Sequence, residues 1–280
     1  MSSGPATLQR SPQYLRFDRY HRVLHGLLMV SFLGLALTGL PLLFSEAQWA
    51  ASLARVFGGF HTAGLVHRTL AVLLIGVFCA HVFRLLHRLF VKKELYILWG
   101  PASMTPQPRD VVEMLAHIRW FLGFGPHPRF DHFTYWEKFD YWAVFWGMGI
   151  IGFSGLMLWF PVFFSRLLPG YFFNVAMLVH GEEALLAVGF IFTIHFFNSH
   201  LRPEKFPMDT VIFTGRVTDE ELRDERPDEF ERLQREQGLA RLRVDPPKRW
   251  VVPLGRTIGT LAVAVGLTLV GLILYAFLSY

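Results

Sequence analysis

The chain has little cysteine and little charge. Among 280 residues there is one cysteine, Cys79, inside an apolar stretch. One thiol excludes an internal disulfide, and it cannot hold an iron–sulfur cluster or attach a c-type haem. We interpret Cys79 as a small packing residue. Charged residues make up 18% of the chain and hydrophobic residues 52%, a balance that is too apolar for an ordinary soluble domain.

Long apolar runs fill much of the chain. Five of them, near residues 23–44, 64–86, 139–160, 173–197 and 257–278, approach the 20 or so residues that a helix needs to cross a bilayer. The sequence therefore predicts an all-α integral membrane protein, with a four-helix transmembrane bundle over 23–200 and a fifth transmembrane helix over 251–280. The first 22 residues lack the apolar core of a signal peptide, so we expect an N-terminal tail and no cleaved leader.

Basic residues alternate with their absence at each expected crossing. Lys and Arg gather in the tail, in the connection between the second and third runs, and in residues 201–250, whereas the other two loops hold Arg55 and Arg166 alone. The positive-inside rule then predicts a cytoplasmic N-terminus and, after five crossings, an outer Tyr280. The formal charge of +5 is thus explained by membrane orientation, and no nucleic-acid binding is expected.

Two polar segments lie outside the apolar runs. Apolar residues recur at helical spacing over about 110–122, which predicts an amphipathic helix in the cytoplasmic interface. In the charged segment 201–250, Thr218 and Glu221 fit a capping box and Pro227 is expected to interrupt the helix that follows. Residues 218–237 read as a solvated charged surface. The last apolar run has no histidine and no charge within it, and we interpret it as an anchor.

Histidines are the unusual feature of the apolar runs. Ionisable side chains at membrane depth are costly and usually face a cofactor, a cavity or a partner. By the predicted orientation, His67 and His180 lie at the same depth near the outer surface. His25, His81 and His195 lie near the inner surface.

The spacing of these histidines indicates two layers. His67 and His81 are 14 residues apart, and His180 and His195 are 15 apart, which is roughly 21–23 Å along a helix and broadly on one helical face. Two such layers suit two stacked b-type haems, each with two axial imidazoles and therefore suited to electron transfer. At this point either His25 or His81 can be the inner partner of His195, and the other is left as a quinone contact or a ligand to a third haem.

Two other functions are open from the residues alone. A proton-coupled transporter without haem would use histidines together with Glu182 and Glu183, which lie just beyond His180. It does not explain the two-layer spacing. A transmembrane reductase of external metal ions would need a nucleotide donor, and no Gly-rich dinucleotide motif supports one.

Three segments carry a resemblance to a known family. "RVLHGLLMVSFLGLALTGLPLLF", "LVHRTLAVLLIG" and "AMLVHGEEALLAVGFIFTIH" resemble the b-type cytochrome subunits of formate dehydrogenases, nickel–iron hydrogenases and thiosulfate reductases, over residues 17–200. The resemblance implies an outer haem on His67 and His180 and an inner haem on His25 and His195. Two departures are Gly26, where the family has an aromatic residue, and the spacing of 15 where 14 is usual.

The resemblance also implies further binding residues and partners. It favours His25 over His81, and it adds Arg22 as a cofactor-binding residue. His200 and Arg202, at the end of the fourth run, are expected to bind haem propionates or a quinone headgroup. It implies menaquinone or ubiquinone, a bacterial cytoplasmic membrane, and an outer redox partner, either a multihaem cytochrome c, an iron–sulfur protein or a dehydrogenase. No complete active site for a separate substrate is expected in this chain.

Overall fold

The structure is a computed structural model that describes residues 11–279, so Arg10 of the expected tail and the predicted position of Tyr280 lie outside the described residues. These described residues are 73% helical. Five helices are long and apolar enough to cross a membrane: Arg19–Leu43, Phe60–Val91, Tyr135–Trp159, Tyr171–Leu201 and Val251–Ser279. Each begins before the apolar run that predicted it. The chain is an all-α, multi-pass membrane protein, as the apolar runs predict.

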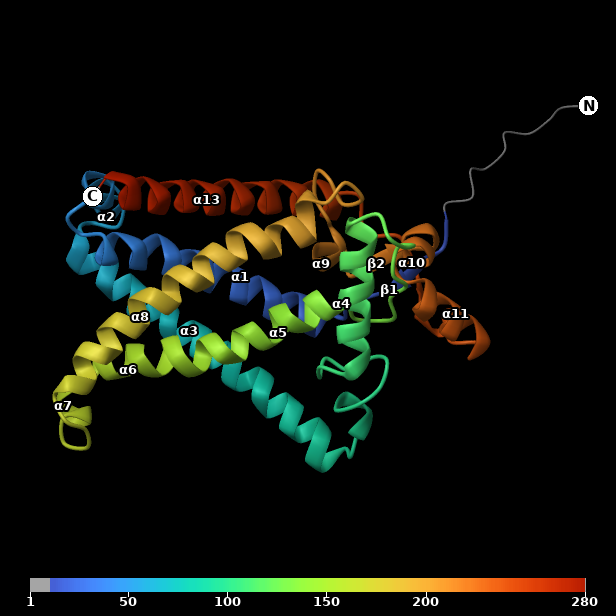
Figure 1. The fold of residues 1–280 in the computed structure, drawn as a ribbon, viewed down its shortest axis with the longest axis horizontal. Helices are drawn as coiled ribbons and strands as arrows, with labels where there is room; N and C mark the ends of the chain where they lie inside the picture. The colour runs from blue at the N-terminus through green and yellow to red at the C-terminus, as the bar shows by residue number, and fades with distance from the viewer. Residues whose placement is uncertain (1–10, 280) are drawn as a thin grey trace, which may run out of the picture. The chain divides into compact units, whose positions relative to one another are not determined.

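The chain divides into two compact units, which we call the transmembrane unit (21–94, 140–210 and 253–279) and the polar unit (11–20, 95–139 and 211–252). The transmembrane unit contains α1 (Arg19–Leu43), α2 (Gln48–Val56), α3 (Phe60–Leu86), α5 (Tyr135–Gly147), α6 (Phe153–Trp159), α7 (Pro161–Phe164), α8 (Tyr171–Phe190) and α13 (Val251–Ser279). The first residues of α1, α5 and α13 belong to the polar unit. π-Helical turns continue these helices at η1 (His87–Val91), η3 (Met148–Gly152), η4 (Ile191–His195) and η5 (Phe197–Leu201). Figure 1 labels the helices of this unit, among them α1, α3, α8 and α13.

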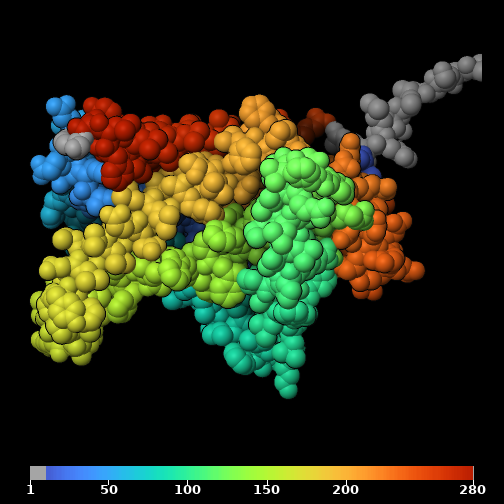
Figure 2. Space-filling model, in the orientation of Figure 1, coloured from blue at the N-terminus to red at the C-terminus, as the bar shows by residue number. Residues whose placement is uncertain are grey.

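The last helix packs closely and is more than an anchor. Its buried side carries small residues at Gly255, Gly259, Ala262 and Gly266, a pattern that lets helices approach closely in a membrane. A Cβ atom on Gly266 would lie 2.6 Å from the ring of Phe192. Figure 2 shows α13 in red lying directly against the orange segment after α8. This contact supports the helix that carries His195.

Cys79 does not pack inside the protein. Its side chain is exposed on the surface of α3, so its interpretation as a packing residue is wrong. A small, weakly polar thiol is tolerated on a face that would contact lipid, because it exposes no strong hydrogen-bonding group.

The polar unit contains a small sheet that the sequence did not predict. Strands β1 (Gln13–Leu15), β2 (Arg216–Thr218) and β3 (Arg243–Val244) form an antiparallel sheet in the order β2-β1-β3. Its helices are α4 (Pro108–Phe121), α9 (Val211–Thr214), α10 (Asp219–Glu225), α11 (Pro227–Arg235) and α12 (Leu239–Leu242), with a 3₁₀ turn η2 (Leu95–Ile97). Tyr14, Leu222 and Phe230 form its small core.

The predicted helix signals in residues 218–237 are confirmed, and the charged side chains are exposed or half-buried, as a solvated surface requires, with two exceptions. Thr218 and Glu221 form a capping box at the start of α10, and Pro227 begins α11. Arg226 and Glu229 are buried, at 9% and 4% exposed. Arg226 pairs with Glu137 at 3.0 Å, and Glu229 pairs with Arg16, just after β1, at 3.2 Å. These partners offset the cost of burying the two charged side chains.

Helix α4 is amphipathic, with its polar side inward. Asp110, Glu113 and His117 are buried, whereas Val111 and Leu115 of the apolar stripe are about half exposed. The helix therefore turns its apolar stripe outward, the arrangement that an interfacial helix requires.

Candidate functional site: two facing pairs of histidines

In the transmembrane unit, His67 of α3 faces His180 of α8. Their ring centroids are 6.4 Å apart and the rings are inclined at 78°. His180 Nδ1 lies 3.0 Å from the carbonyl oxygen of Ile151. A carbonyl can only accept, so His180 carries its proton on Nδ1 and a lone pair on Nε2. We call His67 and His180 the first histidine pair.

Each ring of the first pair lies against the same short sequence pattern, a hydroxyl residue followed by glycine. The hydroxyls of Thr38–Gly39 and Ser154–Gly155 each donate to a carbonyl four residues earlier at 2.7 Å. They lie 3.1 Å and 3.2 Å from Nδ1 of His67 and His180 respectively. A Cβ atom on either glycine would come within 2.9 Å of the Cε1 atom of its ring. The glycines thus leave room for the imidazoles, and the hydroxyls orient them.

His25 of α1 faces His195, the last residue of η4. Their ring centroids are 6.5 Å apart and the rings are inclined at 35°. Asp140 of α5 accepts from Nδ1 of His195 at 2.8 Å, and this contact again leaves the Nε2 lone pair available. His81 lies elsewhere, with its Nε2 atom 3.0 Å from the Tyr141 hydroxyl. We call His25 and His195 the second histidine pair.

A π-helical turn explains how a spacing of 15 residues keeps His180 and His195 on one face. Fifteen α-helical residues would rotate the chain to about +60°, and fourteen to about −40°. A π-helical turn accommodates one extra residue, and η4 inserts such a turn directly before His195. The segment therefore turns through roughly the angle of fourteen α-helical residues.

The centroid separations within both pairs are those that one metal ion between two imidazoles would require. A metal–imidazole bond is about 2.0 Å long, and the ring centroid lies about 1.1 Å behind its nitrogen, so two opposed rings have centroids about 6.2 Å apart. The measured 6.4 Å and 6.5 Å are close to this value. The donor set of two neutral imidazoles is the one that a six-coordinate haem iron takes.

The distance between the two histidine pairs, measured along two different helices, is similar. On α1, His25 and Thr38 are 13 residues apart, or about 20 Å. On the segment Tyr171–Leu201, His180 and His195 are 15 residues apart, or about 22 Å. The two sites thus lie at two depths of the same bundle.

The remaining predicted residues cluster in sequence around the second pair. Arg22 lies one helical turn before His25 on α1, and His200 and Arg202 follow His195 at the end of η5. The Nδ1 atom of His200 is buried and has no hydrogen-bond partner, so this ring has capacity to bind a polar group. Of the two glutamates after His180, Glu183 accepts from Trp146 Nε1 at 3.3 Å, whereas Nδ1 of His180 is held by Ile151 and Ser154.

Sequence reasoning missed the residues that hold the imidazoles. Of these residues, Asp140 could have been found from the sequence, because an acidic residue at the start of an apolar run is itself a signal of function. Ser154 and the carbonyl of Ile151 gave no such signal. Serines that bond back to the helix carbonyl are ordinary in membrane helices, and carbonyls are present at every residue.

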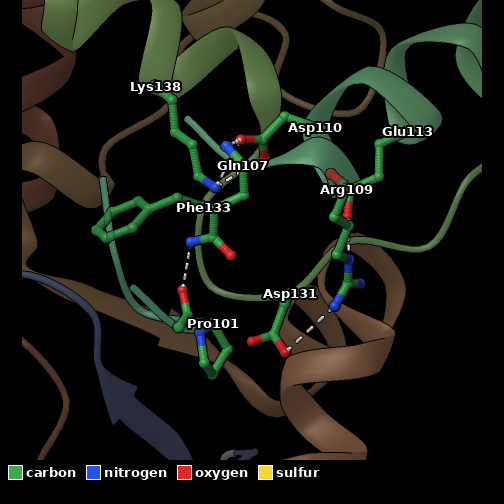
Figure 3. Close-up of a pocket in the computed structure, with 9 residues that line it drawn as sticks. Pro101, Gln107, Arg109, Asp110, Glu113, Asp131, Phe133 and Lys138 are labelled. Carbon is green, nitrogen blue, oxygen red and sulfur yellow. Dashed lines mark hydrogen bonds and ion pairs between the residues drawn. The ribbon is translucent and has the colours of Figure 1, made fainter. Parts of the chain in front are cut away.

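A cavity of about 180 Å³ lies in the polar unit, apart from the predicted residues. Figure 3 shows Lys138 and Asp110 pointing toward one another, with Arg109 beside Asp131. Lys138 Nζ lies 2.7 Å from Asp110 Oδ1, and Arg109 Nε lies 2.6 Å from Glu113 Oε1. Each acidic side chain of the lining therefore has a basic partner, which is typical of a structural ion-pair network.

No protein-family model matches the chain, and no curated protein matches it significantly. Within residues 11–279, no group of three or more histidine, cysteine, aspartate or glutamate side chains is arranged to hold a metal ion. The two histidine pairs fall below this number, because each pair has two members.

Proposed function

We propose that this chain is a di-haem cytochrome b, the membrane subunit of a respiratory oxidoreductase complex. It passes electrons across the bilayer between the quinone pool and a redox partner at the outer face. The observation that carries the proposal is the pair of ring separations, 6.5 Å for His25 and His195 and 6.4 Å for His67 and His180. The resemblance expected from the sequence of the same helices implies the same pairing of histidines.

The protein's own residues have distinct roles in this function. The four histidines would supply the axial ligands, and Thr38, Ser154 and Asp140 orient three of them through Nδ1. A bound haem would supply one-electron redox chemistry. Arg22, His200 and Arg202 are the proposed contacts for haem propionates or a quinone headgroup, and the quinone is menaquinone or ubiquinone.

The proposal extends to location and orientation. The distribution of Lys and Arg favours a cytoplasmic N-terminus, and the family resemblance implies a bacterial inner membrane. The first histidine pair is then near the outer face, and the second pair is near the cytoplasmic face. The outer partner is a multihaem cytochrome c, an iron–sulfur protein or a dehydrogenase.

The test is haem quantification by pyridine haemochrome, with reduced-minus-oxidised spectra of the purified full chain. We expect about two b-type haems per chain, one lost in His180→Ala and one lost in His25→Ala. His81→Ala should keep both, because the Nε2 atom of His81 contacts the Tyr141 hydroxyl at 3.0 Å. His87→Ala is the matched control, since His87 lies in the same transmembrane helix as His67 and His81 and its ring stacks on Phe83.

Three other results are informative. Three haems would assign further histidines as ligands. Loss of a haem in His81→Ala but not in His25→Ala would exchange the two histidines at the second pair. A folded protein without haem would reject the cytochrome, and pH-dependent transport through the histidines and glutamates would replace it.

A further inference from the structure

The acceptors around the two histidine pairs differ in charge. At the first pair, Nδ1 of His180 meets a carbonyl and a hydroxyl, and Nδ1 of His67 meets a hydroxyl. All of these acceptors are neutral. At the second pair, Nδ1 of His195 meets the carboxylate of Asp140.

Asp140 contacts the ring of His195 through its carboxylate. Its side chain is 15% exposed, and the contact of 2.8 Å uses Oδ2. The other oxygen, Oδ1, is buried and has no hydrogen-bond partner. Glu183 offers a contrast within the same unit, because its carboxylate meets the Trp146 indole and makes no contact with a histidine of either pair. Asp140 therefore directs its negative charge at the back of one ligand ring.

We propose that Asp140 is a positioning residue that gives the haem at the second pair the lower reduction potential of the two. This inference rests on the proposed function. A carboxylate that accepts from Nδ1 makes Nε2 a more basic ligand, and a fixed negative charge in a low-dielectric site stabilises the oxidised iron, which carries one more positive charge. The neutral acceptors at the first pair lack this effect.

A direction of electron flow follows from this asymmetry. An electron that moves from the second pair to the first oxidises the lower-potential iron and reduces the higher-potential one, and no bond or proton need change. In the proposed orientation, this favours transfer from a quinol at the cytoplasmic side to an acceptor at the outer face.

The experiment is a spectroelectrochemical titration of the full chain in detergent, followed at the haem α-band. We expect two midpoints in the wild type. His195→Ala should remove the lower midpoint, and His180→Ala should remove the higher one. Asp140→Asn should keep two haems and raise the lower midpoint alone, and Asp140→Glu should restore part of the difference. Glu183→Gln is the control, because it removes an equal charge that does not contact a ligand ring, and it should move neither midpoint.

The outcomes separate this inference from the function on which it rests. A wild-type chain without haem would reject both. Two haems with unmoved midpoints in Asp140→Asn would reject the role of Asp140 and leave the cytochrome intact. If Asp140→Asn fails to hold the second haem, His195→Ala tests which haem has the lower potential. Loss of the higher midpoint in His195→Ala would overturn the proposal that the haem at the second pair has the lower one.

Discussion

At the scale of single residues, the first histidine pair depends on two glycines as much as on the imidazoles. Gly155 and Gly39 stand beside His180 and His67, where any side chain would meet the ring at 2.9 Å. A ring that must move by several tenths of an ångström loses its alignment with the opposite ring and its contact with the neighbouring hydroxyl. The absence of a side chain is therefore part of the site.

We expect Gly155→Ala to weaken haem binding at the first pair by roughly 10–100-fold, the usual cost of disturbing the support of a metal ligand. Occupancy should fall toward one haem per chain in the pyridine haemochrome assay. Gly149→Ala is the control, because a Cβ atom at Gly149, in the same transmembrane helix, would meet nothing within 4 Å. Full occupancy in Gly155→Ala would show that the ring can move without loss of ligation.

At the scale of elements, π-helical turns adjust the angular positions of the site residues. η4 ends at His195, and η3 contains Ile151, whose carbonyl accepts from His180. Such turns shift hydrogen bonds from four residues to five and are frequent at functional sites. Here one turn compensates for the extra residue between His180 and His195.

This compensation predicts opposite effects of two length changes in η4. Deletion of Thr193, which is exposed, leaves a spacing of 14, and a regular α-helix then places His195 on nearly the same face. Insertion of one alanine after Thr193 turns His195 by a further 100° or so. We expect two haems in the deletion variant and one in the insertion variant. Retention of two haems in both variants would show that the register of η4 is not decisive.

At the scale of the whole molecule, the two units are stabilised by different interactions. The transmembrane unit has an apolar core that includes Phe192 and Leu269. In the polar unit, the described core is small, and buried ion pairs are prominent. One of these pairs joins Asp131, just before the third transmembrane helix, to Arg232 of α11 at 2.7 Å.

The polar unit should therefore lose stability in acid. Burial alone would raise the pKa of Asp131, but the hydrogen bonds from Arg232 and from the His132 backbone outweigh it, so its pKa lies below the usual 3.8. A lowered carboxyl pKa contributes stability that is present above the unfolded-state pKa of about 3.9 and is lost as the pH falls further.

Hydrogen exchange of peptides from the polar unit measures this loss. Protection in the wild type should fall between pH 5 and pH 3, after correction for the intrinsic exchange rate. Asp131→Asn should start less protected at pH 7, because Arg232 loses its charged partner, and its protection should change less with pH. Identical pH profiles in the two proteins would exclude Asp131 as the titrating group.

Much of this protein is determined by local patterns in the sequence. Apolar length predicted all five transmembrane helices, because a helix satisfies its backbone hydrogen bonds internally wherever a run is long enough. The capping box of Thr218 and the break at Pro227 were equally local. Histidine spacing also predicted two layers, with His67 and His180 in one and His195 in the other, since the rise per residue of a helix is constant.

Only the tertiary structure decided which side chains meet across helices. It placed His25 opposite His195 and turned His81 to Tyr141, because the rotation of each helix about its axis is set by packing against its neighbours. It likewise joined three short strands that are far apart in the chain, and it brought the carboxylate of Asp140 to the ring of His195. These contacts depend on non-local packing, which helical periodicity does not encode.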